Sequence, residues 1–235
     1  MDINEQVNFY DTHWTFKKLN SLKLMRMVKI LAYFVKVKKE TKQPKILDLG
    51  CGDGRLTALL GEFGEAHGIE LSKKAVEHAN KIYPSATFFQ GNALDFEVSQ
   101  NTYDVVVSQE VLEHVEDQKA YIEVCHRALK SGGYLVLTTP NKWVFDHMSN
   151  GDSWSNQPIE NIITAAQLKT LLKDKFTIVD FDSIVLNFGD RGIFKLINHR
   201  WVKGAFNKIG LKSFRENALG KLGFGLHLCV LARKR

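Results

Sequence analysis

The sequence predicts an α/β protein: a doubly wound, seven-stranded, mostly parallel sheet with an N-terminal helical lid and a helical insert before the last strand. Two observations predict this fold. Through the middle of the chain, short apolar runs rich in Val, Ile and Leu alternate with amphipathic segments of helical length. Glycine or polar residues follow most of these runs, as expected where buried parallel strands lead into helices.

Each element is justified by its own pattern. Strands are expected over residues 45–50, 66–71, 87–90, 103–108, 134–139, 176–184 and 226–232. Helices are expected over 55–62, 73–82, 119–129 and 164–173. Pro84 ends the second helix, Ser131-Gly132-Gly133 closes the third, and Thr164 is an N-cap for the fourth. Residues 1–42 and 187–225 interrupt the alternation and are interpreted as helical covers.

Composition sets the limits of the interpretation. The 235 residues are 44% hydrophobic and 25% charged, which suits one well-buried core without a linker, so a single domain is expected over residues 1–235. Three widely spaced cysteines predict reduced thiols. The polar N-terminus and the absence of an apolar run near ~20 residues predict a cytoplasmic protein. The net charge of +6 allows an anionic partner without requiring one.

The first strand ends in a glycine-rich turn, I-L-D-L-G-C-G-D-G, that is typical of a ligand site. Gly50, Gly52 and Gly54 let the backbone turn tightly and approach a ligand, and the next helix points its free N–H groups the same way. A dinucleotide fingerprint would need glycine where Arg55 stands, and no G-K-[ST] follows for a P-loop. Asp48 suits a ligand that carries an ammonium and a sulfonium rather than a pyrophosphate.

Polar residues also follow the next three strands. Glu70 ends the second strand, where a carboxylate can accept hydrogen bonds from both ribose hydroxyls. Asn92, with the Ala93 backbone, follows the third strand and is placed to contact an adenine edge, while Gln109 ends the fourth. Because the carboxyl ends of parallel strands meet at one edge of a sheet, these side chains are expected to surround one ligand.

The set of motifs resembles the class I S-adenosylmethionine-dependent methyltransferases and their Rossmann-like fold. D-L-G-C-G-D-G, G-I-E-L-S, G-N-A-L-D and Y-D-V-V-V-S-Q-E-V-L-E-H-V carry the resemblance, which covers roughly residues 45–140. It implies S-adenosyl-L-methionine as cofactor and S-adenosylhomocysteine as product. The cofactor-binding residues that it implies are Tyr10, Trp14, Asp48, Gly50, Cys51, Gly52, Glu70, Leu71, Asn92, Ala93 and Gln109. Asn92 stands where the family more often has Asp, and Tyr10 and Trp14 resemble the family's N-terminal lid.

The stretch E-V-L-E-H leaves its role open. Its spacing predicts Glu110, Glu113 and His114 on one face of a helical turn. The three side chains are interpreted as a local structural turn, as a base or substrate contact, or as ligands of a divalent cation, for which a second downstream histidine is lacking. His114, Glu110 and His147 are the candidate catalytic residues, and no metal ligand is assigned. Residues 140–167 are the expected acceptor loop.

The predicted function is methyl transfer to an O or N atom of a small-molecule acceptor: a sugar, a lipid-linked compound or a secondary metabolite. The alternatives are an RNA or quinone O-methyltransferase, with or without a divalent metal, a catalytically inactive cofactor-binding partner subunit, and a dehydrogenase. Residues 1–42 would then cover the site, 43–186 form the cofactor-binding core, 187–225 the insert and 226–235 the last strand. The basic insert is also interpreted as a surface for a membrane or a polyanion; the oligomeric state stays open.

Overall fold

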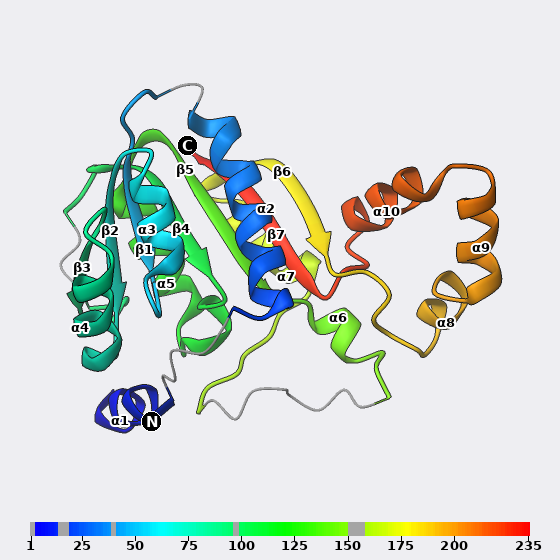
Figure 1. Cartoon of the computed structure of the whole chain (residues 1–235), viewed down its shortest axis with the longest axis horizontal. Helices are drawn as coiled ribbons and strands as arrows, with labels where there is room; N and C mark the ends of the chain where they lie inside the picture. The colour runs from blue at the N-terminus through cyan, green and yellow to red at the C-terminus, as the bar shows by residue number, and fades with distance from the viewer. Residues whose placement is uncertain (1–2, 14–18, 39–40, 96–98, 150–157) are drawn as a thin grey trace.

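A computed structural model describes residues 3–13, 19–38, 41–95, 99–149 and 158–235 of the chain. Within these residues, seven strands form one sheet (Figure 1). Their order across the sheet is β3 (Thr87–Gln90), β2 (Glu65–Glu70), β1 (Lys45–Leu49), β4 (Tyr103–Gln109), β5 (Leu129–Pro140), β7 (His227–Lys234) and β6 (Phe176–Ile184). All neighbours from β3 to β5 are parallel, and β7 runs antiparallel to both β5 and β6. The predicted doubly wound, mostly parallel sheet is confirmed.

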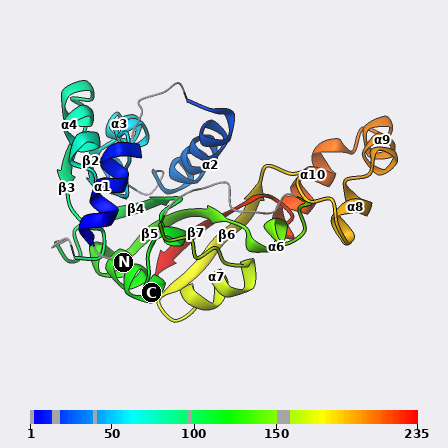
Figure 2. The same cartoon turned by 90° about the horizontal axis from the view of Figure 1, so that it is seen from below.

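Helices cover both faces of this sheet, as Figures 1 and 2 show. One face carries α2 (Ser21–Lys38), α3 (Arg55–Gly61) and α4 (Lys73–Ile82), and the other carries α5 (Gln118–Ala128) and α7 (Ala165–Leu172). The remaining helices are α1 (Ile3–His13), the short 3-10 turn η1 (Leu112–His114), α6 (Lys142–Phe145), α8 (Ile193–Ile197), α9 (Arg200–Lys208) and α10 (Lys212–Lys221). In the described part of the chain, no helix has both the length and the apolar character needed to cross a membrane.

The alternation of side chains along the strands builds two separate apolar layers. On β4, Val105 and Val107 face the layer beneath α2 and α3, whereas Val106 faces the layer beneath α5 and α7. Ile46 and Leu47 of β1 divide in the same way. The continuous apolar runs in the sequence therefore correctly predicted buried strands, because a strand that is covered on both faces has no polar side.

Several boundaries differ from the sequence prediction, most of all the start of β5, which was predicted at residue 134. The third predicted helix ends at Ala128 rather than continuing to Leu129, and β5 begins immediately at Leu129. Leu129 is buried and lies opposite Tyr103 of β4, followed by a register shift before the regular pairing resumes. Ser131-Gly132-Gly133 was expected to be a loop that closes the helix. Pairing with β4 instead makes it part of the irregular start of β5.

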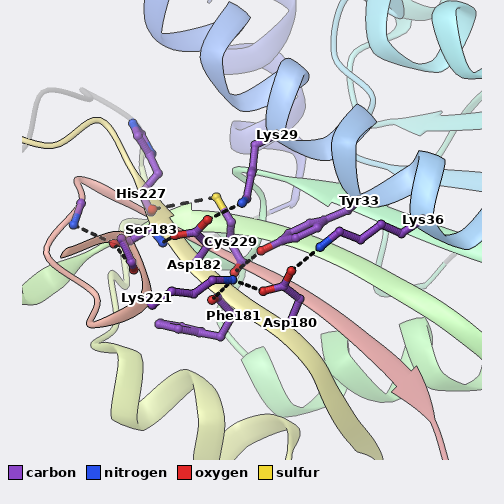
Figure 3. A network of polar contacts seen from close by, with 12 residues as sticks. Lys29, Tyr33, Lys36, Asp180, Phe181, Asp182, Ser183, Lys221, His227 and Cys229 are labelled. Atoms are coloured by element: carbon purple, nitrogen blue, oxygen red, sulfur yellow. Dashed lines mark hydrogen bonds and ion pairs between the residues drawn. The ribbon is translucent and has the colours of Figure 1, made fainter. Parts of the chain in front are cut away.

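Ion pairs attach α2 to the far edge of the sheet. Figure 3 shows Lys29 and Lys36 of α2 reaching Asp182 and Asp180 of β6. Between them, the Tyr33 hydroxyl donates to the Cys229 carbonyl oxygen at 3.3 Å. The part of the N-terminal segment that forms α2 is therefore an integral layer of the sheet, while α1 is a separate element that lies beside α4.

Candidate active site

The glycine-rich turn after β1 has the backbone conformation that its sequence predicts. Gly50 has a φ of 76° and Gly54 a φ of 78°, in the left-handed region that side chains disfavour. A Cβ on Gly50 would lie 2.4 Å from Cγ2 of Val111, so this turn packs directly against the chain after β4. The amides of Gly50 and Cys51 both donate to the Ile69 carbonyl oxygen at 2.8 and 3.0 Å, which ties the turn to the end of β2.

Glu70 completes this tie from the end of β2. Its side chain is 6% exposed, and its two carboxylate oxygens accept hydrogen bonds from the Gly52 and Ser72 amides at 2.9 and 3.0 Å. Both donors are backbone amides, one from the glycine-rich turn and one from the N-cap of α4. The two strand ends are therefore held in register by the same side chain that was predicted to hold a ribose.

A cavity of about 380 Å³ opens at this edge of the sheet. Eleven residues singled out from the sequence line it: Tyr10, Gly50, Cys51, Gly52, Glu70, Leu71, Asn92, Ala93, Gln109, Glu110 and His114. Sequence reasoning missed four polar residues from the N-terminal segment that also line it: Gln6, Asn20, Lys23 and Arg26. Lys23 and Arg26 are three positions apart on α2. This spacing in the sequence could have predicted that both side chains lie on the same face of the helix.

Asn92, the predicted adenine contact, and Gln109, predicted on another side of the cofactor, differ in how their side chains are hydrogen-bonded. The Asn92 side chain is engaged in its own turn, where Nδ2 donates to Asp95 at 2.8 Å and Oδ1 accepts from the Leu94 amide at 3.0 Å. Gln109, by contrast, has a buried Nε2 without a hydrogen-bond partner among the described residues. An unpartnered amide nitrogen beside a cavity is costly unless a ligand completes its hydrogen bonding, so Gln109 is the better-placed polar contact.

Asp48, predicted to bind the cofactor, is not among the residues that line the cavity. Its side chain is 1% exposed and lies beneath the glycine turn, where Oδ2 accepts a hydrogen bond from Thr57 Oγ1 at 2.6 Å. Burial raises the pKa of Asp48 to about 7, although the Thr57 hydrogen bond and the charge of Lys23 act in the opposite direction. Because Asp48 is the fourth residue of a buried strand that has helices on both faces, its side chain points into a layer rather than off the strand end.

The N-terminal helix α1 lies over one end of the cavity. Asp11 accepts a hydrogen bond from the Ser72 hydroxyl at 2.5 Å, and Ser72 is also the N-cap of α4. Burial, followed by the nearby charge of Glu70, raises the pKa of the Tyr10 hydroxyl. Tyr10 therefore lies in the position expected of a lid residue, while Trp14, predicted with it, falls outside the described residues.

The E-V-L-E-H stretch does not form the predicted helical face. Glu110 has a φ of 56°, and only residues 112–114 form a 3-10 turn, so the i, i+3, i+4 geometry is not adopted. Instead, Oε2 of Glu110 lies 2.7 Å from His227 Nδ1 and 3.6 Å from Arg26 Nη1. Arg26 Nη1 lies 3.2 Å from His227 Nε2. Glu110 of the segment after β4 is therefore in contact with His227 of β7 and with Arg26 of α2.

The pKa values of Glu110 and Glu113 are shifted in opposite directions. Burial alone would raise the pKa of Glu110, but the charges of His227 and Arg26 hold that pKa below its usual value. Burial raises the pKa of Glu113 well above its usual value, and the charge of Glu110 adds to the effect. Glu113 is 1% exposed and accepts a hydrogen bond from Thr139 at 2.9 Å. Glu110 is therefore the ionised carboxylate of the pair, and it is the one that lines the cavity.

His114 lies between Glu113 and the cavity. Its Nδ1 is 2.8 Å from the Ile159 carbonyl oxygen, which can only accept, so the proton is on Nδ1. Nε2 is then the acceptor nitrogen and lies 3.6 Å from Glu113. Among the described residues, no group of three or more His, Cys, Asp and Glu side chains is arranged as a metal site.

His147, the third candidate catalytic residue, is not at this site. It is absent from the cavity lining, and its Nδ1 contacts the Trp143 carbonyl oxygen at 2.8 Å. Its ring packs against Trp143 and Phe194, with centroid distances of 6.0 and 5.4 Å. The short helix α6 therefore directs His147 into an aromatic cluster beside the insert.

Comparison with known proteins identifies the family. A family model described as a methyltransferase domain matches residues 40–179. The chain belongs to this methyltransferase family. A protein of Mycolicibacterium smegmatis named "Probable S-adenosylmethionine-dependent methyltransferase" is 30% identical over 129 residues, 54% of this chain and 49% of that protein. The ubiquinone biosynthesis O-methyltransferase of Thiobacillus denitrificans is 32% identical over 145 residues, 57% of this chain and 58% of the relative. The chain thus spans about half the length of the curated relatives it matches.

A solved structure supports the same fold. An S-adenosylmethionine-dependent methyltransferase from Mesorhizobium loti has a TM-score of 0.59 at 19% identity, covering 86% of this chain and 97% of its own. The predicted methyltransferase family and the Rossmann-like fold are confirmed.

The residues at the cavity fit the cofactor S-adenosylmethionine. The positive-φ glycine turn provides a cradle that side chains would obstruct, the Glu70 carboxylate lines the cavity, and Gln109 Nε2 is buried without a described partner. On this fit, Glu70 would hold the ribose hydroxyls and Gln109 would contact the ligand from the β4 side. S-adenosylmethionine supplies a methyl group activated by its sulfonium charge.

Proposed function

We propose that the protein transfers a methyl group from S-adenosylmethionine to an O or N atom of a small-molecule acceptor: a sugar, a lipid-linked compound or a secondary metabolite. The observation that carries this proposal is the pair Glu110 and His114 at the cavity, beside the glycine turn. An ionised carboxylate and an imidazole acceptor nitrogen suit a hydroxyl or ammonium group that must be oriented and must lose a proton.

The two side chains have different roles in this proposal. Glu110 is held ionised by Arg26 and His227. Its carboxylate can therefore accept a hydrogen bond from the substrate and orient it, but its lowered pKa makes it a weak base. His114 presents Nε2 as an acceptor nitrogen because Nδ1 is bonded to Ile159, and imidazole is the usual general base near neutral pH. His114 therefore takes the proton, and Glu110 positions the group that loses it.

The first experiment is transfer of isotopically labelled methyl from S-adenosylmethionine into a cell extract that is then separated into small-molecule, lipid, polysaccharide, RNA and protein fractions. Label in one of the first three, suppressed by excess S-adenosylhomocysteine, is expected. Label in RNA would replace the proposal with an RNA methyltransferase. Absence of label in every fraction, together with measured cofactor binding, would favour the inactive partner subunit.

Variants of the two side chains then test their roles. With the acceptor identified, His114→Gln is expected to lower kcat by about 10²–10⁴-fold if the acceptor atom is a hydroxyl oxygen. Glu110→Gln is expected to raise KM for the acceptor more than it changes the pH dependence of kcat. Both variants should bind the cofactor with near wild-type affinity by calorimetry. Wild-type kcat in His114→Gln with a hydroxyl acceptor would remove His114 from the mechanism.

A quinone-type aromatic hydroxyl is the second candidate acceptor. It is favoured by the relatives named as ubiquinone biosynthesis O-methyltransferases, which align at 29–32% identity over 57–60% of this chain. A catechol is the simplest probe, since it carries the hydroxyl pair without a lipid tail. Glu113 is bonded to Thr139 and has a raised pKa, so a cation site there is disfavoured and we expect turnover to be unchanged by a chelator. Loss of turnover that added Mg²⁺ restores would contradict this expectation.

A further inference from the structure

The insert between β6 and β7, residues 187–225, forms a lobe that projects beyond the edge of the sheet. Figures 1 and 2 show α8, α9 and α10 extending away from β6, with α9 farthest from the sheet core. None of the residues of α9 is buried. The lobe is therefore an addition to the sheet and not one of the layers that cover it.

The base of this lobe is held by its own aromatic cluster. Trp143 of α6, Phe194 of α8 and Phe224 after α10 meet with ring centroids 4.7–5.4 Å apart. Asn141 is fully buried, and its Nδ2 donates to the Gly223 and Gly225 carbonyl oxygens at 2.8 Å each. The inward-facing apolar side chains of the insert already have partners, so further apolar residues on its outer side are not required for folding.

The lobe nevertheless exposes many apolar side chains. Seven large ones are exposed: Ile193, Leu196, Trp201, Ile209, Leu211, Phe214 and Leu222. Trp201 is 72% exposed and Phe214 65% exposed, which is unusual for such large apolar side chains. Trp201 lies in the first turn of α9, and Ile209 directly follows its last residue. A gathering of exposed aromatic and aliphatic residues in one lobe indicates an interaction surface.

The same lobe carries the net charge of the protein. Residues 187–225 contain eight Lys and Arg against two acidic residues, a net charge of +6 that equals the formal net charge of the whole chain. Arg215 and Lys221 are used internally, on the Ile197 carbonyl oxygen and on Asp180. The other six are Arg191, Lys195, Arg200, Lys203, Lys208 and Lys212, and none of them forms an ion pair within the described ranges.

We propose that this lobe binds peripherally to the surface of an anionic phospholipid membrane. Basic side chains are attracted to anionic headgroups, while Trp, Phe and Leu side chains enter the boundary between headgroups and acyl chains. Exposed aliphatic residues such as Leu196 and Ile209 have no role in binding RNA, which uses charge and stacking. The centre of a protein–protein interface is usually depleted of lysine, whereas here lysines lie among the apolar residues. The proposal does not depend on the acceptor of the methyl group.

Vesicle sedimentation tests the proposal with the full-length protein. Vesicles of phosphatidylcholine with 30% phosphatidylglycerol are expected to sediment the wild type, and vesicles of phosphatidylcholine alone are expected to leave most of it in solution. The charge variant Lys195→Gln/Lys203→Gln/Lys208→Gln/Lys212→Gln should bind at least about tenfold more weakly. The matched control is Lys73→Gln/Lys74→Gln/Lys81→Gln, on the surface of α4, and it should bind like the wild type.

The apolar contribution has a separate readout. Brominated phosphatidylglycerol vesicles should quench tryptophan fluorescence of the wild type, and the quenching should largely disappear in Trp201→Phe while sedimentation is retained. Trp201→Ser/Phe214→Ser should reduce sedimentation, whereas Val28→Ser, at an exposed apolar residue of α2, should not. Unchanged S-adenosylmethionine affinity shows that each variant is folded.

Three outcomes would overturn the proposal: wild-type protein that stays in solution with anionic vesicles, binding that the charge variant and the control variant reduce equally, or quenching that Trp201→Phe leaves intact. Binding to RNA in place of vesicles, or a concentration-dependent dimer that Trp201→Ser abolishes, would assign the surface to a different partner.

Discussion

At the scale of single residues, three buried carboxyl groups and the partly buried carboxyl group of Glu110 lie close to the cavity, and each is stabilised differently. Glu70 is bonded to backbone amides, and Glu110 is paired with His227 and Arg26. Asp48 and Glu113 each have one hydroxyl donor and raised pKa values. Burial penalises an ionised carboxylate unless bonds or charges compensate, so the local partners decide which of the four are ionised at neutral pH.

Glu70→Ala is expected to weaken S-adenosylmethionine binding by about 1–3 kcal/mol, the loss of charge-assisted hydrogen bonds to the ligand and to the glycine turn. Calorimetry measures it. Glu70→Gln keeps an acceptor oxygen and should lose less. Glu65→Ala, at the exposed start of the same strand, is the matched control and should leave the affinity unchanged. Wild-type affinity in Glu70→Ala would rule out the ribose-binding role.

Asp48 predicts a pH dependence of the cofactor-free protein. In the unfolded chain an Asp side chain loses its proton near the ordinary pKa of 3.8, whereas the folded carboxyl keeps its proton up to a pKa of about 7. Between these values the folded state binds more protons than the unfolded state, so the free energy of unfolding falls as the pH rises, by on the order of 2–4 kcal/mol. Asp48→Asn should lack most of this fall in urea titrations between about pH 4.5 and 7.5. Equal pH dependence in variant and wild type would contradict the raised pKa.

At the scale of elements, the lid depends on one contact between helices. Asp11 of α1 bonds to the Ser72 hydroxyl, which caps α4, and Ser72 also donates its amide to Glu70. The position of the lid is therefore connected to the carboxylate that would hold the ribose. The side of the cavity proposed to hold the methyl acceptor also depends on two elements. The turn η1 carries His114, and α2 supplies Arg26, which pairs with Glu110.

Asp11→Ala is expected to raise the Kd for S-adenosylmethionine by roughly tenfold. The substitution removes a hydrogen bond to a charged group, which contributes about 1.5–3 kcal/mol, but the other contacts of α1 remain. The free energy of unfolding should change little, because α1 covers no layer of the sheet. Glu5→Ala, an exposed acid on the same helix, is the control for general charge effects. An unchanged Kd in Asp11→Ala would show that α1 does not close over the cofactor.

At the scale of the whole molecule, α2 connects the site to the far edge of the sheet. Its first turns supply Lys23 and Arg26 to the cavity, and farther along the helix Lys29 and Lys36 pair with β6 (Figure 3). Asp180 also pairs with Lys221 of α10, so the same edge anchors the lobe. A single helix thus joins the cavity, the sheet edge and the insert.

Asp182→Ala should destabilise the protein by about 1–2 kcal/mol, because the Lys29 pair is mostly shielded from water, with both side chains 19% exposed. Urea unfolding measures the change. Glu77→Ala removes an exposed pair with Lys73 on α4 and should change the free energy of unfolding by less than about 0.5 kcal/mol. Equal effects of the two substitutions would show that the edge contact adds nothing to stability.

The sequence by itself determined the order of strands and helices and the cofactor side of the site. These features are local: apolar periodicity marks the strands, and the strand-end residues Gly50, Glu70 and Gln109 follow them directly, so parallel pairing brings them to one edge. The tertiary structure alone decided that Asp48 is buried beneath the turn, that His147 packs beside the insert, and that Glu110 has a left-handed backbone conformation.

The tertiary structure also decided which side chains contact Glu110. Because β7 runs antiparallel to β5, its first residue, His227, lies opposite Pro140 at the edge where the parallel strands end. Arg26 reaches the same carboxylate from α2. The three residues are separated by up to 201 positions in the chain, so no local pattern could bring them together; the antiparallel strand and the packing of α2 on the sheet do so.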